Sequence, residues 1–388
     1  MLARDRDQED RASTPLELLF DLCFVVAVAQ AAGRLHHGLV EGDGHVGSTI
    51  LSYTLVFFAI WWGWMNFTWF ASAYDTDDVP YRLLTLLQIA GVLVLAAGVP
   101  KAFDSRDYAT VAAGYVLMRA AMVSQWLRAA YGYPTGRRVA LRFGFGIATV
   151  QVGWVAWVLF VPQPWKLAGF AVLSALELAV PVFAEHAGPP TAWHPGHIAE
   201  RYGLFTLIVL GEVVSAATSA VQAAITAGGL STPLLMVAAG GLVLIFAIWW
   251  SYFDHPATEG LRRGPTGSAF RWGYGHVLVF ASLAAVGAGL QVAAETVGDH
   301  TNLSDRAAAL TLAVPTALYL VAVGVLHTWV NRRDVRPLPR KLAAALLVLL
   351  AAAATPQLPL ALTVALIGLT VAGLIALDLI LPPRPSAA

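Results

Sequence analysis

The feature that most constrains this chain is a series of apolar stretches of about 20 residues that follow one another along most of its length. A helix needs about 20 mostly apolar residues to cross the hydrocarbon core of a bilayer. The sequence therefore predicts twelve membrane-spanning helices. They lie near residues 16–33, 48–71, 82–100, 108–131, 141–161, 165–184, 198–222, 233–253, 270–294, 307–330, 341–355 and 359–381. Pro356 and Pro359 interrupt the last stretch, so residues 341–381 form either two helices or one kinked helix.

The composition agrees with a membrane protein. Of the 388 residues, 58% are hydrophobic and 12% are charged, whereas a soluble domain carries about 25% charged residues. The 24 Lys and Arg residues balance the 24 Asp and Glu residues, so no basic field attracts nucleic acid. The single cysteine excludes a disulfide framework and a zinc site built from cysteines. We expect an all-α integral membrane protein that contacts membrane lipids, binds no nucleic acid and needs no cofactor.

Positive charges fall mainly on one side of the twelve predicted spans. Eighteen of the 24 Lys and Arg residues lie at the side that holds both termini, five lie at the other side, and Arg119 lies within a span. Loops rich in Lys and Arg stay in the cytoplasm. Residues 1–15 carry mixed charges before the first apolar run, which is unlike a signal peptide. We therefore predict a cytoplasmic N-terminal segment over residues 1–15 and a cytoplasmic C-terminus.

The two halves of the chain contain similar motifs. The motif from Phe58 to Trp62 recurs from Phe246 to Trp250. Weaker matches follow in the same order: Tyr81-Arg82 with Phe270-Arg271, Trp126 with Trp329, and Arg137-Arg138 with Arg340-Lys341. They predict two parallel six-helix repeats, over residues 16–185 and 198–388, joined by a cytoplasmic linker over residues 186–197. The alternative is that Trp and Arg recur because membrane interfaces favour them.

Ionisable residues inside the predicted spans are the main candidates for a functional site, because a charge near the bilayer centre costs about 2.5–3.5 kcal/mol. Glu17 and Asp21 are four residues apart and share one helix face. Thr14, Pro15 and Glu17 resemble a helix-capping box, and we favour this role for Glu17. Asp21 lies too deep for a cap, so we expect it to face the interior of the bundle.

Three further charged residues lie near the middle of predicted spans: Arg119, Glu177 and Glu212. Pro181 leaves the backbone carbonyl of Glu177 free, and a free carbonyl beside a carboxylate suits a cation or a proton. Arg119 needs an acidic partner, for which the sequence offers Asp21, Glu177 or Glu212. For Glu177 the alternative is a kink beside a neutral side chain, and for Arg119 it is structural pairing alone.

Uncharged polar residues in the spans give weaker signals. Trp61 and Trp62 lie too deep for an interfacial belt, so we expect them to line a cavity, with Asn66 nearby. His276 can titrate near neutral pH, although a lone histidine usually serves packing. His194 and His197 flank a Pro-Gly pair that breaks a helix, and no acidic or cysteine cluster completes a site. We therefore predict no metal site.

Two charged segments resemble a known family. Residues 15–25 resemble the E-L-F-F-D-L-x-F-V signature of the bacterial low-temperature-requirement A family, and residues 197–212 resemble its E-R-F-G-L-F-x-I-I-x-L-G-E segment. Trp61-Trp62, Asn66 and residues 75–82 are also similar to this family. The resemblance implies a multi-spanning protein of the bacterial cytoplasmic membrane that is linked to growth in the cold. It implies signature roles for Glu17, Asp21, Asp75, Asp78, Arg82, Glu200, Arg201 and Glu212.

The several carboxylates in a repeated bundle favour a transporter over an enzyme. We expect a proton-coupled carrier of a small solute, with Asp21, Glu212 and Glu177 handling protons and Arg119 as counter-charge or anion contact. The alternatives are a membrane-embedded enzyme or lipid-handling protein, and a sensor or scaffold without turnover. A lipid enzyme would use carboxylates for acid–base chemistry. The best candidate for such chemistry is the segment from Asp75 to Asp78, which could bind a cation. We favour the alternative that this segment is a solvated loop. The sequence does not determine the oligomeric state, and a homo-oligomer is compatible with it.

Overall fold

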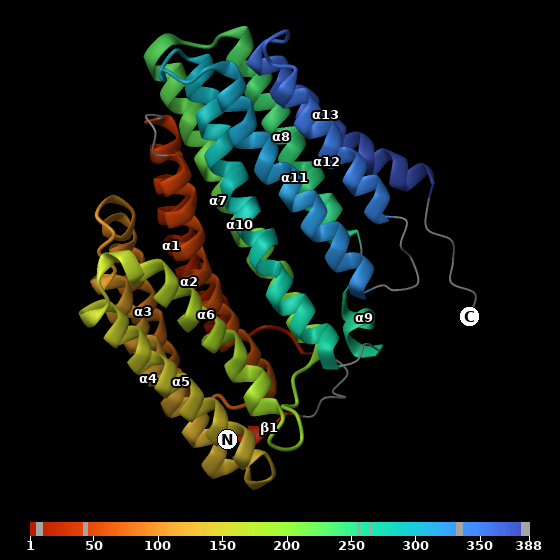
Figure 1. Cartoon of the computed structure of the whole chain (residues 1–388). Helices are drawn as coiled ribbons and strands as arrows, with labels where there is room; N and C mark the ends of the chain where they lie inside the picture. Colours follow the sequence, from red (N-terminus) through yellow and green to blue (C-terminus); the bar gives the residue numbers. More distant parts are fainter. Residues whose placement is uncertain (5–10, 42–45, 255–256, 264–265, 331–336, 382–388) are drawn as a thin grey trace. The chain divides into compact units, whose positions relative to one another are not determined.

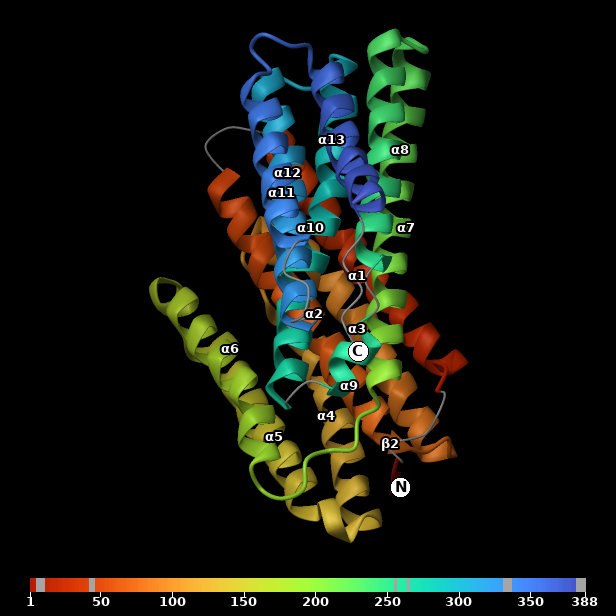
Figure 2. The same ribbon diagram turned by 90° about the vertical axis from the view of Figure 1, so that its right-hand side faces the viewer.

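The computed structural model describes residues 1–4, 11–41, 46–254, 257–263, 266–330 and 337–381, and nearly all of them are helical. The helices are α1 (Pro15–Val40), α2 (Val46–Ala73), α3 (Val79–Asp104), α4 (Ala109–Gly132), α5 (Arg137–Phe160), α6 (Gln163–Glu185), α7 (Pro195–Gly228), α8 (Thr232–Phe253), α9 (Thr258–Arg263), α10 (Thr266–Val297), α11 (Asp305–Val330), α12 (Pro337–Ala353) and α13 (Leu360–Ile380). Each predicted span falls on one helix, and Figures 1 and 2 show these helices.

Ten of the described helices are long and apolar enough to cross a membrane, two fewer than predicted. The chain is thus a multi-pass membrane protein. The fourth and eleventh predicted spans form helices α4 and α12 but are not among the ten. Helix α12 has 17 residues, which is short of the roughly 20 that a bilayer requires. Helix α4 carries Arg119 and several polar side chains, which lower its hydropathy.

The last two helices answer the question that the sequence left open. Residues 337–381 form two helices, α12 and α13, with a turn from Ala354 to Leu358 between them, and not one kinked helix. Pro359 precedes the first residue of α13, where a missing N–H leaves no hydrogen bond unmade. The charged segment over residues 331–336, which contributes to the predicted orientation, lies outside the described residues, as do Arg6 and Arg384.

The chain divides into two compact units. The first comprises Met1–Gln30 and Ala59–Arg201, and the second comprises Ala31–Phe58 and Tyr202–Ala388. The division runs through α1, α2 and α7, and not through the predicted linker over residues 186–197. The boundaries of the two predicted repeats, and the repeats themselves, stay a prediction.

In the first unit, α3 packs against α4, α4 against α5, and α5 against α6 (Figure 1). A Cβ atom on Gly91 of α3 would lie 2.7 Å from the backbone oxygen of Gly114 in α4, so these two helices approach at backbone contact. Small residues at helix interfaces are the usual basis of close packing in membranes. Asp78 caps α3 because its side chain accepts a hydrogen bond from the backbone N–H of Tyr81.

A two-stranded antiparallel sheet, which the sequence analysis did not predict, holds the start of the chain in this unit. Strand β1 (Leu2–Ala3) pairs with β2 (Tyr74–Asp75), and the backbone N–H of Arg4 donates to the carbonyl of Ala73 at 3.1 Å. The N-terminus is therefore tied to the end of α2.

In the second unit, α10 packs against α11, α11 against α12, and α13 against α8 (Figure 2). The contact of α10 with α11 is again close, because a Cβ atom on Gly289 would lie 2.6 Å from the carbonyl oxygen of Thr311.

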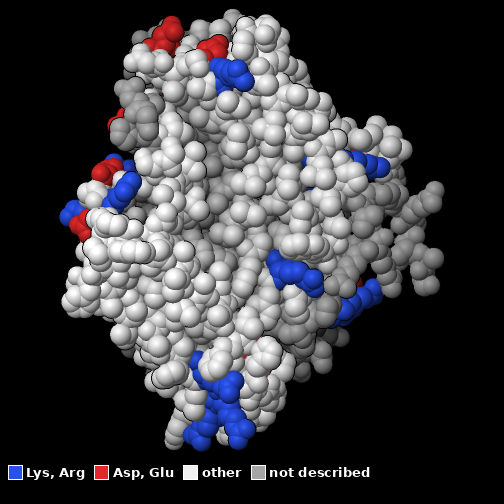
Figure 3. All heavy atoms as spheres, in the orientation of Figure 1, with Lys and Arg blue, Asp and Glu red and all other residues white. Residues whose placement is uncertain are grey.

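The face of the protein in Figure 3 is mostly neither acidic nor basic, with charge in separate patches. This agrees with a lipid-facing surface.

Candidate functional site

Five charged or titratable side chains meet in the first unit. They come from the segment before α1, from α1 and from the first two turns of α7, and we call them the α1–α7 charge cluster: Arg11, Glu17, Asp21, His197 and Arg201. None of the five side chains is more than 5% exposed. Buried charges persist only when they are paired and hydrogen-bonded, so the contacts within this cluster decide its chemistry.

Glu17 has two roles. The backbone N–H of Thr14 donates to its carboxylate at 2.7 Å, and the Thr14 hydroxyl accepts from the Glu17 N–H at 3.2 Å, which confirms the predicted capping box. The same carboxylate also accepts a hydrogen bond from Arg11 at 3.1 Å. It lies 3.3 Å from His197 Nε2 and 3.4 Å from an Arg201 nitrogen. Glu17 is therefore a cap and also a member of the charge cluster.

Asp21 is fully buried, and its carboxylate is held from two sides. Arg201 donates to it from Nε at 3.1 Å and also from Nη2. Trp64 Nε1 donates at 2.7 Å from α2. A two-pronged guanidinium contact is among the strongest that a carboxylate can make. The predicted interior position of Asp21 is thus borne out, with Arg201 as its partner.

The cluster is balanced in charge. Two guanidinium groups face two carboxylates, and Arg11 remains a cation at neutral pH because burial lowers its pKa only to about 10. Removing one of the four charged members would leave an unpaired buried charge, which costs about 3–5 kcal/mol. The imidazole of His197 lies between Arg11 and Glu17, so its protonation state affects the balance directly.

A second buried carboxylate, Glu177 in α6, has three donors from three other helices of the first unit. Trp62 of α2 donates at 2.7 Å, Trp154 of α5 at 3.2 Å, and Arg119 of α4 at 3.2 Å. Arg119 and Glu177 are 3% and 1% exposed. Of the three partners that the sequence offered for Arg119, the structure places Glu177 beside it. Trp62, predicted to line a cavity, serves as a donor to this carboxylate.

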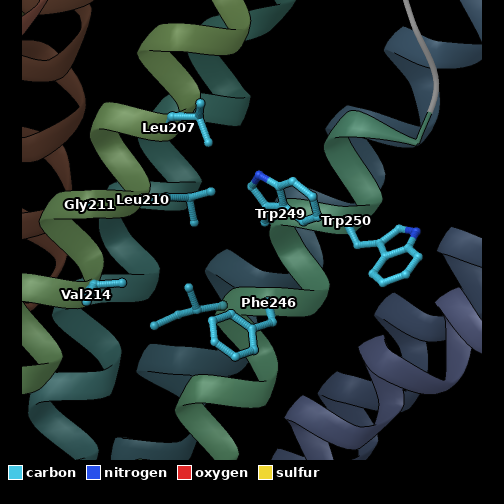
Figure 4. A pocket seen from close by; sticks show the side chains of 8 residues that line it. Leu207, Leu210, Gly211, Val214, Phe246, Trp249 and Trp250 are labelled. Atoms are coloured by element: carbon cyan, nitrogen blue, oxygen red, sulfur yellow. The ribbon is translucent and has the colours of Figure 1, made fainter.

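Glu212 belongs to the second unit and joins neither cluster. Its side chain is half-buried on α7, where its carboxylate has no hydrogen bond or ion pair with the described residues. The residue before it, Gly211, lines an open groove of about 560 Å³ between α7 and α8. The described residues that line the groove are all apolar: Leu207, Leu210, Gly211, Val214, Ile245, Phe246, Trp249 and Trp250 (Figure 4).

Other predicted residues serve local structure. Glu200 accepts a hydrogen bond from the Ser13 N–H at 3.2 Å. Asp78 caps α3 and pairs with Arg128 at 2.6 Å, and Arg82 pairs with the exposed Asp77 at 2.7 Å. Asp75 contributes its backbone to β2.

The remaining predicted residues also have structural surroundings. Asn66 donates to the carbonyl of Trp62 one turn earlier, at 2.7 Å. Trp61 is 1% exposed. His276 is fully buried in the second unit, between the Tyr252 hydroxyl at 3.0 Å and the Trp272 carbonyl at 2.7 Å. Among the described residues no group of three or more His, Cys, Asp or Glu side chains is arranged to hold a metal ion.

Several site residues were missed in the sequence. Arg11 was counted only as one of the cytoplasmic charges, and His197 was considered only as a metal ligand. Trp64 and Trp154 were not recognised as donors to carboxylates. The available signal was the number of buried acids, because each deep carboxylate requires donors on neighbouring helices, and tryptophans at equal depth are natural candidates.

Comparison with known proteins gives one family and one distant relative. The model of the family described as bacterial low temperature requirement A protein matches residues 12–377. An uncharacterized protein of Rhizobium meliloti (strain 1021), RA0937, is 27% identical over 305 residues, which cover 71% of this chain and 68% of that protein. The family match includes every member of the α1–α7 charge cluster except Arg11, which lies one residue before it.

Proposed function

The chain belongs to the bacterial low temperature requirement A family, and from this premise we propose that it is a proton-coupled secondary transporter of a small solute in the bacterial cytoplasmic membrane. The observation that carries the proposal is the α1–α7 charge cluster, with two carboxylates, two guanidinium groups and one imidazole, all buried. Ionisable groups inside membrane helices commonly mark the path of an ion, a proton or a charged substrate.

The energetics support a functional role for the cluster. Replacing a buried ion pair with well-packed apolar residues is often neutral, or stabilising by about 1–4 kcal/mol. A purely structural bundle therefore gains little from five buried ionisable groups. Arg119 and Glu177 add a second buried pair in the same unit. Groups of this kind are useful where a proton or a charged substrate must be bound and released.

We assign roles from the contacts of each residue. Asp21 and Glu17 are the proton-exchanging carboxylates. Each accepts hydrogen bonds from neighbouring donors, and protonation of the carboxylate would weaken these bonds. Arg119 and Glu177 form a second site that accepts a polar group of the solute. Glu212 is the further proton-binding acid, because its carboxylate lacks a counter-ion among the described residues.

Uptake into proteoliposomes tests this proposal. The purified protein is reconstituted, a mixture of small metabolites from a bacterial extract is offered with a proton gradient, and accumulated compounds are identified by mass spectrometry. We expect one compound or class to accumulate with the gradient. Asp21→Asn and Glu212→Gln should lower its uptake by about tenfold or more. The matched control is Glu259→Gln, on the exposed side of α9, which should leave uptake unchanged.

Two outcomes would contradict the proposal. One is that no compound accumulates under any imposed gradient. The other is that Asp21→Asn and Glu212→Gln proteins, shown to be folded by size-exclusion chromatography and circular dichroism, take up solute at the wild-type rate.

A second candidate function is lipid handling, and the groove between α7 and α8 favours it. All eight lining residues are apolar, and the groove is open on one side (Figure 4). Because both helices are membrane spans, the natural occupant of such a groove is an acyl chain. Glu212 next to the groove would then act on, or bind, the polar end of the lipid.

Native mass spectrometry of the protein released from nanodiscs distinguishes the two functions. Lipid handling predicts a retained phospholipid that is lost in Gly211→Trp, which fills the groove, and kept in Gly373→Trp. Gly373 lies on α13, and its added Cβ also has open space around it. Equal lipid retention by both variants would exclude the groove as a specific lipid site.

A further inference from the structure

The imidazole of His197 lies between a cation and an anion in the α1–α7 charge cluster. Its Nδ1 atom is 3.1 Å from Arg11 Nη1, and its Nε2 atom is 3.3 Å from Glu17 Oε1. A guanidinium group has only donors. The bond to Arg11 therefore requires a lone pair on Nδ1. His197 must then be neutral, with its proton on Nε2, the nitrogen that lies 3.3 Å from the Glu17 carboxylate.

We propose that Nδ1 of His197 is a proton-binding site closed by the Arg11 guanidinium, so that binding of a proton and release of Arg11 from the cluster are a single event. A proton on Nδ1 would place one N–H group against another, and the hydrogen bond could not persist. The protonated imidazole and the bound Arg11 thus exclude each other.

The charge balance makes this exchange feasible in a buried place. With Arg11 bound, two guanidinium groups balance two carboxylates. With Arg11 released and His197 protonated, one guanidinium and one imidazolium balance the same two carboxylates. The buried site stays neutral in both states and avoids the cost of an unpaired charge. Among the residues that the structure describes, the titratable and charged groups around His197 and Arg11 are Arg4, Glu17, Asp21, Tyr81, His194, Glu200 and Arg201.

Few contacts hold the segment that carries Arg11. Besides its bonds to His197 and Glu17, Arg11 donates to the Ala71 carbonyl at 2.7 Å. The Ser13 N–H donates to Glu200 at 3.2 Å, and the Thr14 N–H donates to Glu17 at 2.7 Å. Among the described residues, loss of the Arg11 contacts would leave these two backbone bonds, the bond from the Glu17 N–H to the Thr14 hydroxyl, and the bond of Arg4 to Ala73 before the segment. Because thermodynamic coupling is reciprocal, release of the segment raises the proton affinity of His197 by the same factor by which proton binding favours release.

Nitrogen-15 NMR of histidine-labelled protein in nanodiscs tests the site without any transported solute, so its outcome is independent of the proposed function. His197→Gln identifies the resonance. In the wild type at pH 7.5 we expect a neutral ring with the proton on Nε2. In Arg11→Met we expect His197 to become protonated at a proton concentration about tenfold lower than in the wild type, because the site lacks one positive charge. Arg11→Lys, which keeps the charge, should lie closer to the wild type.

Hydrogen exchange at the backbone N–H groups of Ser13 and Thr14 reports release of the segment. After correction for intrinsic rates, we expect protection in the wild type to fall by about tenfold as the pH falls and His197 becomes protonated. His197→Gln should stay protected, since its side-chain oxygen can accept from Arg11 and its amide can donate to Glu17. His186→Gln, at the exposed end of α6, is the matched control and should behave as the wild type.

Three results would overturn the proposal. The wild-type ring could carry its proton on Nδ1. The protonation of His197 could be the same in Arg11→Met as in the wild type. The protection of Ser13 and Thr14 could be the same at all pH values in the wild type. Because the third needs only the wild type, a variant that fails to fold does not leave the site untested.

Discussion

The Trp-Trp pair that ends the repeated five-residue motif occurs in both units and has different surroundings in each. In the first unit, Trp61 and Trp62 are each 1% exposed, and the Trp62 indole donates to the buried Glu177. In the second unit, Trp249 and Trp250 are each 44% exposed and line the apolar groove. A tryptophan can provide a hydrogen-bond donor or an apolar surface, and each unit uses a different property.

The buried polar groups of the two units differ in the same way. Those of the first unit include fully buried ion pairs, in the α1–α7 charge cluster and between Arg119 and Glu177. The second unit buries Lys341 against the Ser251 hydroxyl at 2.6 Å, and His276 against Tyr252. If the units descend from one repeat, their buried polar residues have diverged while the membrane-spanning helices have been kept. We therefore expect charge removal to matter far more in the first unit.

Arg201→Met should have the largest effect on stability. It leaves the Asp21 and Glu17 carboxylates with one guanidinium group between them, and we expect a loss of about 3–5 kcal/mol in the free energy of unfolding. Lys341→Met is the matched change in the second unit. It removes hydrogen bonds to Ser251 but leaves no unpaired carboxylate in contact, and should cost about 1–2 kcal/mol. Chemical denaturation in detergent measures both, and equal losses would remove the distinction between the units.

Arg119→Met and Glu177→Gln should each cost about 2–3 kcal/mol, because each leaves its partner buried without a counter-charge. The double variant should cost less than the sum of the two losses, since it removes both charges together. Additive losses would mean that the 3.2 Å contact contributes no coupling.

Trp62→Phe should cost about 1.5–3 kcal/mol, which is typical for a hydrogen bond to a charged group. Trp250→Phe, at the matching position of the second motif, should change stability by less than about 0.5 kcal/mol because its ring lines an open groove. Thermal unfolding of both variants in the same detergent gives the comparison. A larger loss for Trp250→Phe would reverse the proposed roles of the two motifs.

Glu212→Gln should have the smallest effect, within about 0.5 kcal/mol, because the half-buried carboxylate has no partner among the described residues. The same variant is expected to lose most of its solute uptake. A stability loss as large as that of Arg201→Met would indicate a contact for Glu212 that the structure does not contain.

Hydropathy predicted the helices well because a membrane-spanning helix requires a continuous apolar run, which can be identified from the sequence alone. The capping box at Glu17 was also predictable, since both of its residues lie within one turn. Ten of the twelve predicted spans have the length and hydropathy of a membrane helix, whereas α4 falls short because it carries polar side chains and α12 because it is short. Polarity in α4 and length in α12, and not the position of either helix in the chain, distinguish these two from the other ten.

Contacts between helices were less predictable. The pairing of Asp21 with Arg201 joins residues 180 positions apart, and the rotation of each helix that permits it leaves no pattern in hydropathy. Arg119 was expected to need an acid, but three acids were equally suitable. The pairing of β1 with β2 was missed because strands of two residues carry no periodicity. Arg11 lies outside the apolar runs, so its burial was unexpected.

Proton coupling through the first unit is tested most directly by solute uptake into proteoliposomes with and without an imposed proton gradient. For the wild type, we expect the gradient to raise the initial rate by about tenfold or more. For Asp21→Asn, whose amide can still accept the hydrogen bond from Trp64, we expect the two rates to be equal. A folded Asp21→Asn protein whose uptake still rises with the gradient as in the wild type would contradict a proton-carrying role for the charge cluster.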